Sequence, residues 1–107
     1  MVFIETTIFT REIEALLPDD SYRRLQQALV VRPEAGSLIP GGGGLRKLRW
    51  NLPQAGKRGS LRIIYYWDAP GDTVYMLLAY KKSRQQDLTP DQIAPTQAET
   101  AATKAGR

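Results

Sequence analysis

Basic residues are concentrated in the middle of this 107-residue chain, and the chain contains no histidine. Residues 41–87 carry nine of the 15 Lys and Arg residues but only three acids, a net charge of +6, whereas residues 1–40 have a net charge of −2. Cations neutralise phosphates and aromatic rings stack on bases, so this basic segment, which is also rich in Tyr and Trp, favours a polyanionic ligand, with RNA as the first candidate. Without histidine, any proton transfer there must use Lys, Arg, Tyr or a carboxylate. The nine basic residues are Arg46, Lys47, Arg49, Lys57, Arg58, Arg62, Lys81, Lys82 and Arg84.

The first part of the basic segment is predicted to be a half-buried strand. Residues 45–51 alternate, with Leu48 and Trp50 on one face and Lys47 and Arg49 on the other. The alternation places two cations on the outer face of the strand. Because exposed charges are common, this pattern taken alone also fits an ordinary solvated face.

Two further strands are predicted at residues 61–67 and 74–80, joined by a turn at residues 70–72. Both segments are apolar on their two faces, so they should lie in the centre of the sheet. Arg62 interrupts the first of them. Because a lone charge is costly to bury, Arg62 must find a counter-ion, the edge of the sheet or a ligand.

The first third of the chain predicts a short strand at residues 2–5 and two helices. Thr7 is expected to cap the first helix, and Asp19 or Asp20 the second, which ends before Pro33. The apolar positions expected to face the core are Ile8, Ile13, Leu16 and Leu17 in the first helix, and Tyr22, Leu25, Leu29 and Val30 in the second. Residues 34–44, with four consecutive glycines, are predicted to be a loop with a flexible glycine connector.

The order of these elements, βααβββ, predicts an α+β fold: a small antiparallel-type sheet with two N-terminal helices packed on one face. After the last strand, Thr89 and Pro90 begin a capping-box pattern that predicts a short helix. Residues 94–107 contain no Leu, Val or aromatic residue, so they cannot bury enough surface to offset their ordering entropy. We therefore expect one domain over residues 1–93 and a flexible tail over residues 94–107.

The composition argues against several classes of protein. The chain has no cysteine, which fits a reducing cytoplasm. Its first residues include Glu5 and lack both a basic region and a long apolar run, so we expect neither a signal peptide nor a membrane span. The acids of the basic segment are scattered and no His or Cys accompanies them, so we expect no metal site and no cofactor. The glycine run lacks the GK[ST] that a phosphate-binding P-loop requires.

Four motifs in order resemble the RelE/ParE toxin superfamily, and most closely its HigB branch of type II toxin-antitoxin modules. These motifs are an N-terminal FIET that leads into two helices, GGGGLRKLRW, GKRGSLRIIYYW and LLAYKKSRQQDLTPDQ. The resemblance covers residues 2–93. It implies a ribosome-dependent mRNA endonuclease, or mRNA interferase, that inhibits translation without a metal: the 2′-OH beside the scissile bond attacks phosphorus while the enzyme moves protons and stabilises the phosphorane.

The resemblance also implies roles for particular residues. Arg62 and Lys82, or Lys81 if the register differs by one, would stabilise the phosphate and the transition state. Lys47 and Arg49 would bind the RNA, or one of them would act as base, and Tyr80 would stack or transfer a proton. A lysine base would need a lowered pKa, which neighbouring cations favour. The other residues that we predict to bind RNA are Arg46, Lys57, Arg58, Lys81, Arg84 and Tyr66.

The chain departs from the superfamily at one catalytic position. The best-known ribonucleases of the superfamily use a tyrosine in the C-terminal helix, whereas no tyrosine follows Tyr80 here. Either Tyr80 or Tyr66 substitutes, or the ribosome supplies most of the effect by orienting the RNA, since positioning alone contributes roughly 7 to 11 kcal/mol in favourable cases.

The resemblance implies partners and leaves two rival functions. The expected partners are the ribosome, mRNA and a cognate antitoxin, in the HigB branch a helix-turn-helix HigA-like protein that covers the basic surface or blocks ribosome entry. The toxin alone should be a monomer in the cytoplasm, without membrane contact. The rivals are a ParE-like poison of DNA gyrase, against which the basic residues argue, and a non-catalytic RNA-binding or ribosome-binding domain.

Overall fold

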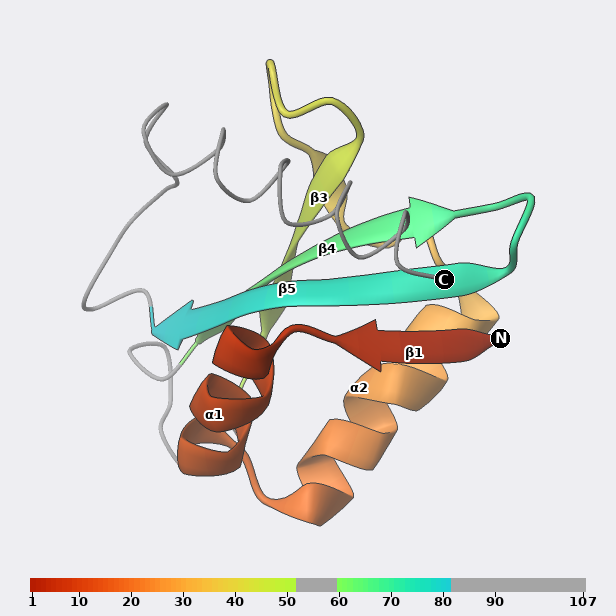
Figure 1. Ribbon diagram of the computed structural model, residues 1–107. Helices are drawn as coiled ribbons and strands as arrows, with labels where there is room; N and C mark the ends of the chain where they lie inside the picture. The colour runs from red at the N-terminus through yellow and green to blue at the C-terminus, as the bar shows by residue number, and fades with distance from the viewer. Residues whose placement is uncertain (52–59, 82–107) are drawn as a thin grey trace.

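A computed structural model of the chain describes residues 1–51 and 60–81. The elements are β1 (Val2–Glu5), α1 (Thr7–Leu16), α2 (Asp19–Val31), β2 (Ser37–Leu38), β3 (Leu45–Trp50), β4 (Leu61–Asp68) and β5 (Thr73–Lys81). The strands form one sheet in the order β1-β5-β4-β3-β2, and both helices lie on the same face of it (Figure 1). The predicted α+β fold, with two helices before the main strands, is confirmed.

The sheet differs from the prediction in two details. β1 pairs with β5 in parallel, whereas the other three pairings are antiparallel, so the sheet is mixed. The segment predicted as a loop at residues 34–44 contains the two-residue strand β2, which pairs with β3 at one edge of the sheet. β4 and β5 occupy the central positions expected from their apolar faces.

The N-cap of helix α1 lies one residue earlier than predicted. Thr6, not Thr7, is the N-cap, and its hydroxyl accepts a hydrogen bond of 3.0 Å from the Phe9 amide. Phe9 and Ile13 are buried, whereas Ile8 is 46% exposed, so the prediction for Ile8 was wrong. The buried positions Phe9 and Ile13 are four residues apart, as one face of a helix requires.

Helix α2 buries Leu25 and Leu29 as predicted, but Val30 is 52% exposed. Its N-cap is Pro18, so Asp19 lies in the first turn. There the negative charge of Asp19 interacts favourably with the positive end of the helix dipole. The Tyr22 hydroxyl donates a 2.6 Å hydrogen bond to the Glu5 carboxylate, which ties α2 to the end of β1. Burial, followed by the contact with Glu5, raises the pKa of Tyr22, so this phenol stays protonated.

Buried side chains form a separate cluster on each face of the sheet. The cluster between the sheet and the helices contains Phe9, Ile13, Leu17, Leu25, Leu29, Leu61, Ile63, Tyr65, Val74, Met76 and Ala79. The cluster on the opposite face contains Leu45, Ile64, Tyr75, Leu77 and Tyr80. These clusters identify which strand residues point toward the helices and which point away from them.

The glycine run forms a hydrogen-bonded turn that joins β2 to β3, within the segment predicted to be a loop. The Ile39 amide donates to the Leu45 carbonyl at 2.9 Å, and the Gly42 amide donates to the Ile39 carbonyl at 2.9 Å. Gly41 and Gly44 have φ values of +71° and +100°, in the region that L side chains rarely adopt. Backbone hydrogen bonds and positive φ angles together explain why this turn requires glycine.

Gly44→Ala should destabilise the fold more than Gly41→Ala, although both residues have positive φ. A Cβ at Gly41 would meet nothing within 4 Å, so this change should cost only about 1 to 2 kcal/mol for the backbone conformation. A Cβ at Gly44 would lie 2.8 Å from the Tyr66 ring, which adds roughly 1 to 3 kcal/mol of overpacking. Urea unfolding of the two variants checks the difference. Equal losses would mean that the Tyr66 ring moves aside at no cost.

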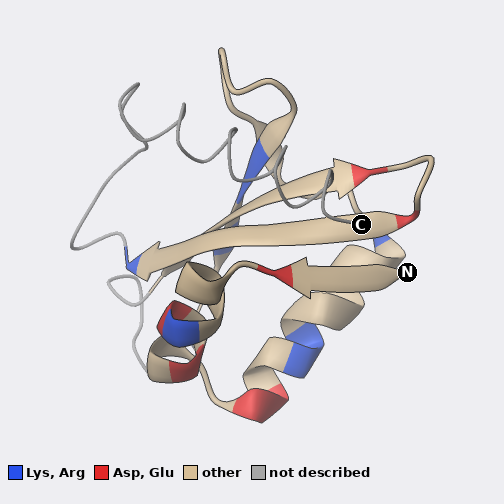
Figure 2. Ribbon diagram, viewed as in Figure 1, with Lys and Arg blue, Asp and Glu red and all other residues tan. Residues whose placement is uncertain are grey.

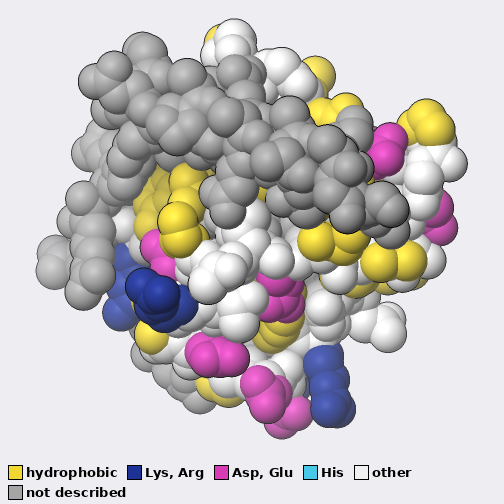
Figure 3. Space-filling model, viewed as in Figure 1, with side chains coloured by type: hydrophobic (Ala, Val, Ile, Leu, Met, Phe, Trp, Pro, Cys, Tyr) yellow, Lys and Arg dark blue, Asp and Glu magenta, His cyan; other side chains and the backbone are white. Residues whose placement is uncertain are grey.

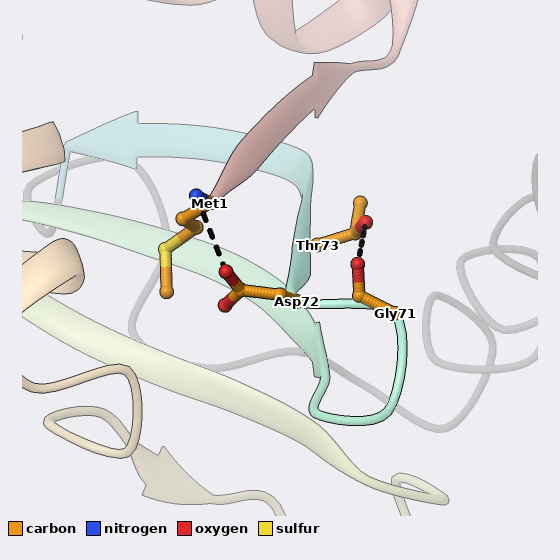
Figure 4. Close-up of polar contacts among 4 residues, drawn as sticks. All are labelled: Met1, Gly71, Asp72 and Thr73. Carbon is orange, nitrogen blue, oxygen red and sulfur yellow. Dashed lines mark hydrogen bonds and ion pairs between the residues drawn. The ribbon is translucent and has the colours of Figure 1, made fainter.

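The first residues of the chain are anchored on the turn between β4 and β5 (Figure 4). The amino group of Met1 lies 3.2 Å from the Asp72 carboxylate, and the Val2 amide donates to the Asp72 carbonyl at 3.0 Å. Asp72 itself has a φ of 46°, which Asp tolerates better than most residues. Thr73 also donates to the Gly71 carbonyl within this turn. These contacts fix the parallel register of β1 beside β5.

Neither described helix is long and apolar enough to cross a membrane. The predicted helix at Thr89 and the predicted tail at residues 94–107 lie outside the described residues.

Candidate functional site

The register of three strands aligns Arg49, Arg62 and Tyr80 in one row across the sheet. Arg49 of β3 pairs with Arg62 of β4, and Arg62 pairs with Tyr80 of β5. In the next row, Lys47 pairs with Ile64. Directly opposite residues on one face have Cβ atoms about 4.5 to 5.5 Å apart, so these side chains are immediate neighbours.

This row lies on the face of the sheet opposite the helices. Leu48 and Trp50 pack against the cluster on the helix side, so the alternating residues Lys47 and Arg49 point away from it, as predicted. Tyr80 belongs to the cluster on the opposite face. We call the surface formed by Lys47, Arg49, Arg62 and Tyr80 the basic face. It brings together four of the five residues predicted to be catalytic.

Arg62 is the most unusual residue of the basic face. Its side chain is only 3% exposed, and within the described residues its Nη1 atom has no hydrogen-bond partner. Its neighbour across the strand pair, Arg49, carries a like charge. A guanidinium without an anionic partner is costly to bury, and its fixed fork of donors matches a phosphate or carboxylate. We expected Arg62 to have a counter-ion, to lie at the edge of the sheet or to bind a ligand. β4 is a central strand, and the described residues provide no counter-ion, so among these residues the alternative that remains is a ligand.

Arg46, which we predicted to bind RNA, lies on the other side of β3 from the basic face. Arg46 lies two residues before Leu48 and therefore points to the same side of β3. Its guanidinium donates hydrogen bonds to the main-chain carbonyls of Glu34 and Gly36, at 3.3 and 2.8 Å. The Tyr65 hydroxyl supports the same segment, because it accepts from the Gly36 amide at 2.8 Å. Arg46 therefore holds the chain that leads into β2.

Other predicted site residues are also separated from Arg62. Lys81 pairs with Leu61, whose side chain faces the helices, so Lys81 lies on that side too. Tyr66 lies on the same face as Arg62, but Ile64 lies between them on β4. The Tyr66 ring packs against the Tyr75 ring, and the two ring centroids are 6.3 Å apart. The remaining predicted residues, Lys57, Arg58, Lys82 and Arg84, lie outside the described residues.

Charges are distributed unevenly over the rest of the molecule. Asp68 and Asp72 lie at the β4–β5 turn, at the opposite end of these strands from Arg62 and Tyr80 (Figure 2). On the helical layer, acidic and basic side chains are interspersed (Figure 3). Among the described residues, no group of Asp and Glu side chains could hold a metal ion. Among the described residues, the charges that share the face of Arg62 are therefore the cations Lys47 and Arg49 of β3.

Sequence reasoning missed Glu12, which reaches the end of β5 from α1. One oxygen of its carboxylate accepts a 3.3 Å hydrogen bond from the amide of Ala79, the residue before Tyr80. Burial raises the pKa of Glu12, and the hydrogen bond from Ala79 acts in the opposite direction. The contact joins residues 67 positions apart, so no local pattern in the sequence signals it.

No protein-family model matches this sequence. The fold is similar to that of a solved structure of the E. coli toxin RelE, a mutant with two arginines replaced by alanine, in the free state. The TM-score is 0.56 and the sequence identity 18%, and the match covers 79% of this chain and 86% of that chain. The chain therefore has a RelE-like fold.

Proposed function

We propose that this protein is the toxin of a type II toxin-antitoxin module, and that its basic face cleaves mRNA on the ribosome. The observation that carries the proposal is Arg62, a buried cation whose Nη1 donates to no described residue, in a row with Arg49 and Tyr80. The RelE-like fold supports it, because the matched protein is a toxin. The motifs of the sequence further favour the HigB branch.

The proposed reaction is a transesterification at one RNA phosphodiester. The 2′-oxygen forms a bond to phosphorus, the bond from phosphorus to the 5′-oxygen breaks, and a proton moves from the 2′-OH to the leaving oxygen. Arg62 would stabilise the charge that grows on the non-bridging oxygens, since its donors are already desolvated and need no reorganisation. Lys47 and Arg49 are more exposed and would hold the flanking phosphates.

Tyr80 is the described residue best placed to move a proton. It is the cross-strand partner of Arg62 and is 9% exposed, so its side chain lies on the same side of the sheet as the proposed phosphate site and is largely shielded from solvent. At this degree of burial the ring has little free surface on which a base could stack. Between the two roles predicted for Tyr80, we therefore favour proton transfer over stacking.

The proposed partners follow from the same function. The RNA would be a message held in the decoding site, and the antitoxin a HigA-like protein that covers the basic face or blocks entry to the ribosome. We also propose that residues 1–93 form the catalytic domain, and that the toxin alone is a cytoplasmic monomer. An acidic segment of the antitoxin would satisfy the donors of Arg62 while it blocks the site.

Mapping of 5′ ends on a reporter message in a reconstituted translation reaction tests the proposal. Wild-type protein should create new ends at codons in the ribosomal A site. Arg62→Ala should lower the cleavage rate by about 100- to 1,000-fold, the usual loss when one preorganised donor to transition-state charge is removed. Lys82→Ala tests the residue predicted beyond β5, and Arg24→Ala, an exposed change on α2, should cleave normally.

The rival functions give different results in the same assays. An intact message together with inhibited DNA supercoiling would identify a gyrase poison. An intact message with the protein bound to ribosomes would identify a non-catalytic binding domain. Cleavage that Arg62→Ala leaves unchanged would contradict the proposed role of the basic face.

A further inference from the structure

The position of Tyr80 on the basic face depends on an irregularity in β5. Tyr65 pairs with Met76 and Ile64 pairs with Leu78, so Leu77 is an extra residue in the pairing of β4 with β5. A β-bulge of this kind shifts the alternation of all later residues by one position.

The two core clusters confirm the shift. Before the bulge, Val74 and Met76 face the helices and Tyr75 faces away from them. After the bulge, Ala79 faces the helices and Tyr80 faces away. Unbroken alternation from Tyr75 would have put Tyr80 on the helix side, away from Arg62.

Side chains of α1 and its cap hold the bulge from the edge of the sheet. β1 pairs with β5 only as far as Met76, where β1 ends at Glu5. Beyond that point the Thr6 hydroxyl donates to the Leu77 carbonyl at 2.9 Å, and the Glu12 carboxylate accepts from the Ala79 amide at 3.3 Å. The two contacts lie on either side of Leu78 and take the place of a neighbouring strand.

We propose that Glu12 is a positioning residue that holds the bulge of β5 and thereby keeps Tyr80 beside Arg62. Its effect passes through the backbone of Ala79, so Glu12 itself touches no substrate. Thr6 contributes from the other side of the bulge, but it also caps α1, which makes Glu12 the cleaner residue to test. The effect on cleavage rests on the proposed function, whereas the placement of Tyr80 does not.

Glu12→Met and Glu12→Gln separate positioning from general stability. Met keeps the length of the side chain but lacks the acceptor, and Gln keeps an oxygen that can accept from Ala79 without the charge. Glu12→Met should lower the cleavage rate by about 10- to 100-fold, the range expected for a small misplacement of a reacting group, and Gln should restore it. Glu14→Met, at an exposed position of the same helix, is the matched control and should cleave normally.

A double variant adds a second test. If Glu12 acts through Tyr80, Glu12→Met should add little to the loss caused by Tyr80→Phe, because the two changes remove the same contribution. Additive losses would mean that Glu12 matters only for folding or for another part of the site.

The final measurement does not depend on activity. In the full-length protein, NMR cross-peaks between the Tyr80 ring and the Arg62 side chain should be present in the wild type and in Glu12→Gln, and lost or weakened in Glu12→Met. Unchanged cross-peaks and an unchanged rate in Glu12→Met would overturn the inference. If Glu12→Met does not fold, loss of the cross-peaks in Glu12→Gln, despite the retained acceptor, would overturn it as well. An inactive wild type with this pattern of cross-peaks would reject the proposed function and leave the positioning role intact.

Discussion

Replacing Arg62 with Met should make the protein more stable and lower the cleavage rate by about 100- to 1,000-fold. Arg62 is 3% exposed and its Nη1 has no partner among the described residues, so folding removes the guanidinium from water without full compensation. Methionine fills a similar volume with no charge. Replacement of buried charged groups by apolar residues of similar size commonly adds about 1 to 4 kcal/mol to the free energy of unfolding, and we expect a gain within this range.

Thermal and urea unfolding of the two proteins measure this effect in the absence of any RNA. Arg49→Met is the matched control, because Arg49 is exposed on the neighbouring strand and its loss should change stability by less than about 0.5 kcal/mol. A loss of stability in Arg62→Met would show that Arg62 has an anionic partner within the protein. In that case the basic face would not be a preformed anion site.

The same variant predicts a difference in ligand response. A short single-stranded RNA should raise the melting temperature of the wild type, since a ligand that binds only the folded state stabilises it by mass action. It should have much less effect on Arg62→Met. Arg62 would then lower the stability of the free protein while it enables RNA binding, a combination that is common at binding sites.

Much of the basic face could be predicted from the sequence, because its strands follow simple alternation. Leu48 and Trp50 fixed the side on which Lys47 and Arg49 lie, and the apolar flanks of Arg62 predicted its burial. The same alternation places Arg46 on the side of β3 that carries Leu48, so charge alone could not show that Arg46 lies away from Arg62.

The remaining features depend on contacts between distant segments. The extra residue Leu77 lies in an apolar run with no local mark of a bulge, yet it decides the side on which Tyr80 lies. Glu12 looks like an ordinary helix residue until α1 is packed against β5. The parallel pairing of β1 and the strand β2 also depend on tertiary structure, since each segment is too short to signal its partner.

Arg49→Glu should have the second large effect, a loss of RNA binding together with a small gain in stability. Arg49 stands directly opposite Arg62, and like charges in such a pair are unfavourable. A glutamate there would give Arg62 a counter-ion that the described residues do not supply, worth roughly 0.2 to 1 kcal/mol for a cross-strand pair. It would also place a negative charge where a phosphate is expected to bind, and such juxtaposition costs several kcal/mol, or more than about 100-fold in affinity.

The salt dependence of RNA binding shows how many phosphate contacts are lost. We assume that Lys47, Arg49 and Arg62 each neutralise one phosphate of a single RNA strand. A plot of the logarithm of the binding constant against the logarithm of the salt concentration should then have a slope of about −2. Arg49→Glu removes one of these cations and pairs a second with its carboxylate, so the slope should fall to about −0.7.

Arg24→Glu is the control for net charge. It makes the same change in total charge on α2, an exposed position on the opposite side of the sheet. Binding should therefore weaken only slightly, and the slope should stay near that of the wild type, because long-range fields are screened within about 8 Å at physiological salt. Equal losses of RNA affinity in the two variants would mean that binding depends on the overall charge of the protein. The row formed by Arg49, Arg62 and Tyr80 would then not be the RNA-binding site.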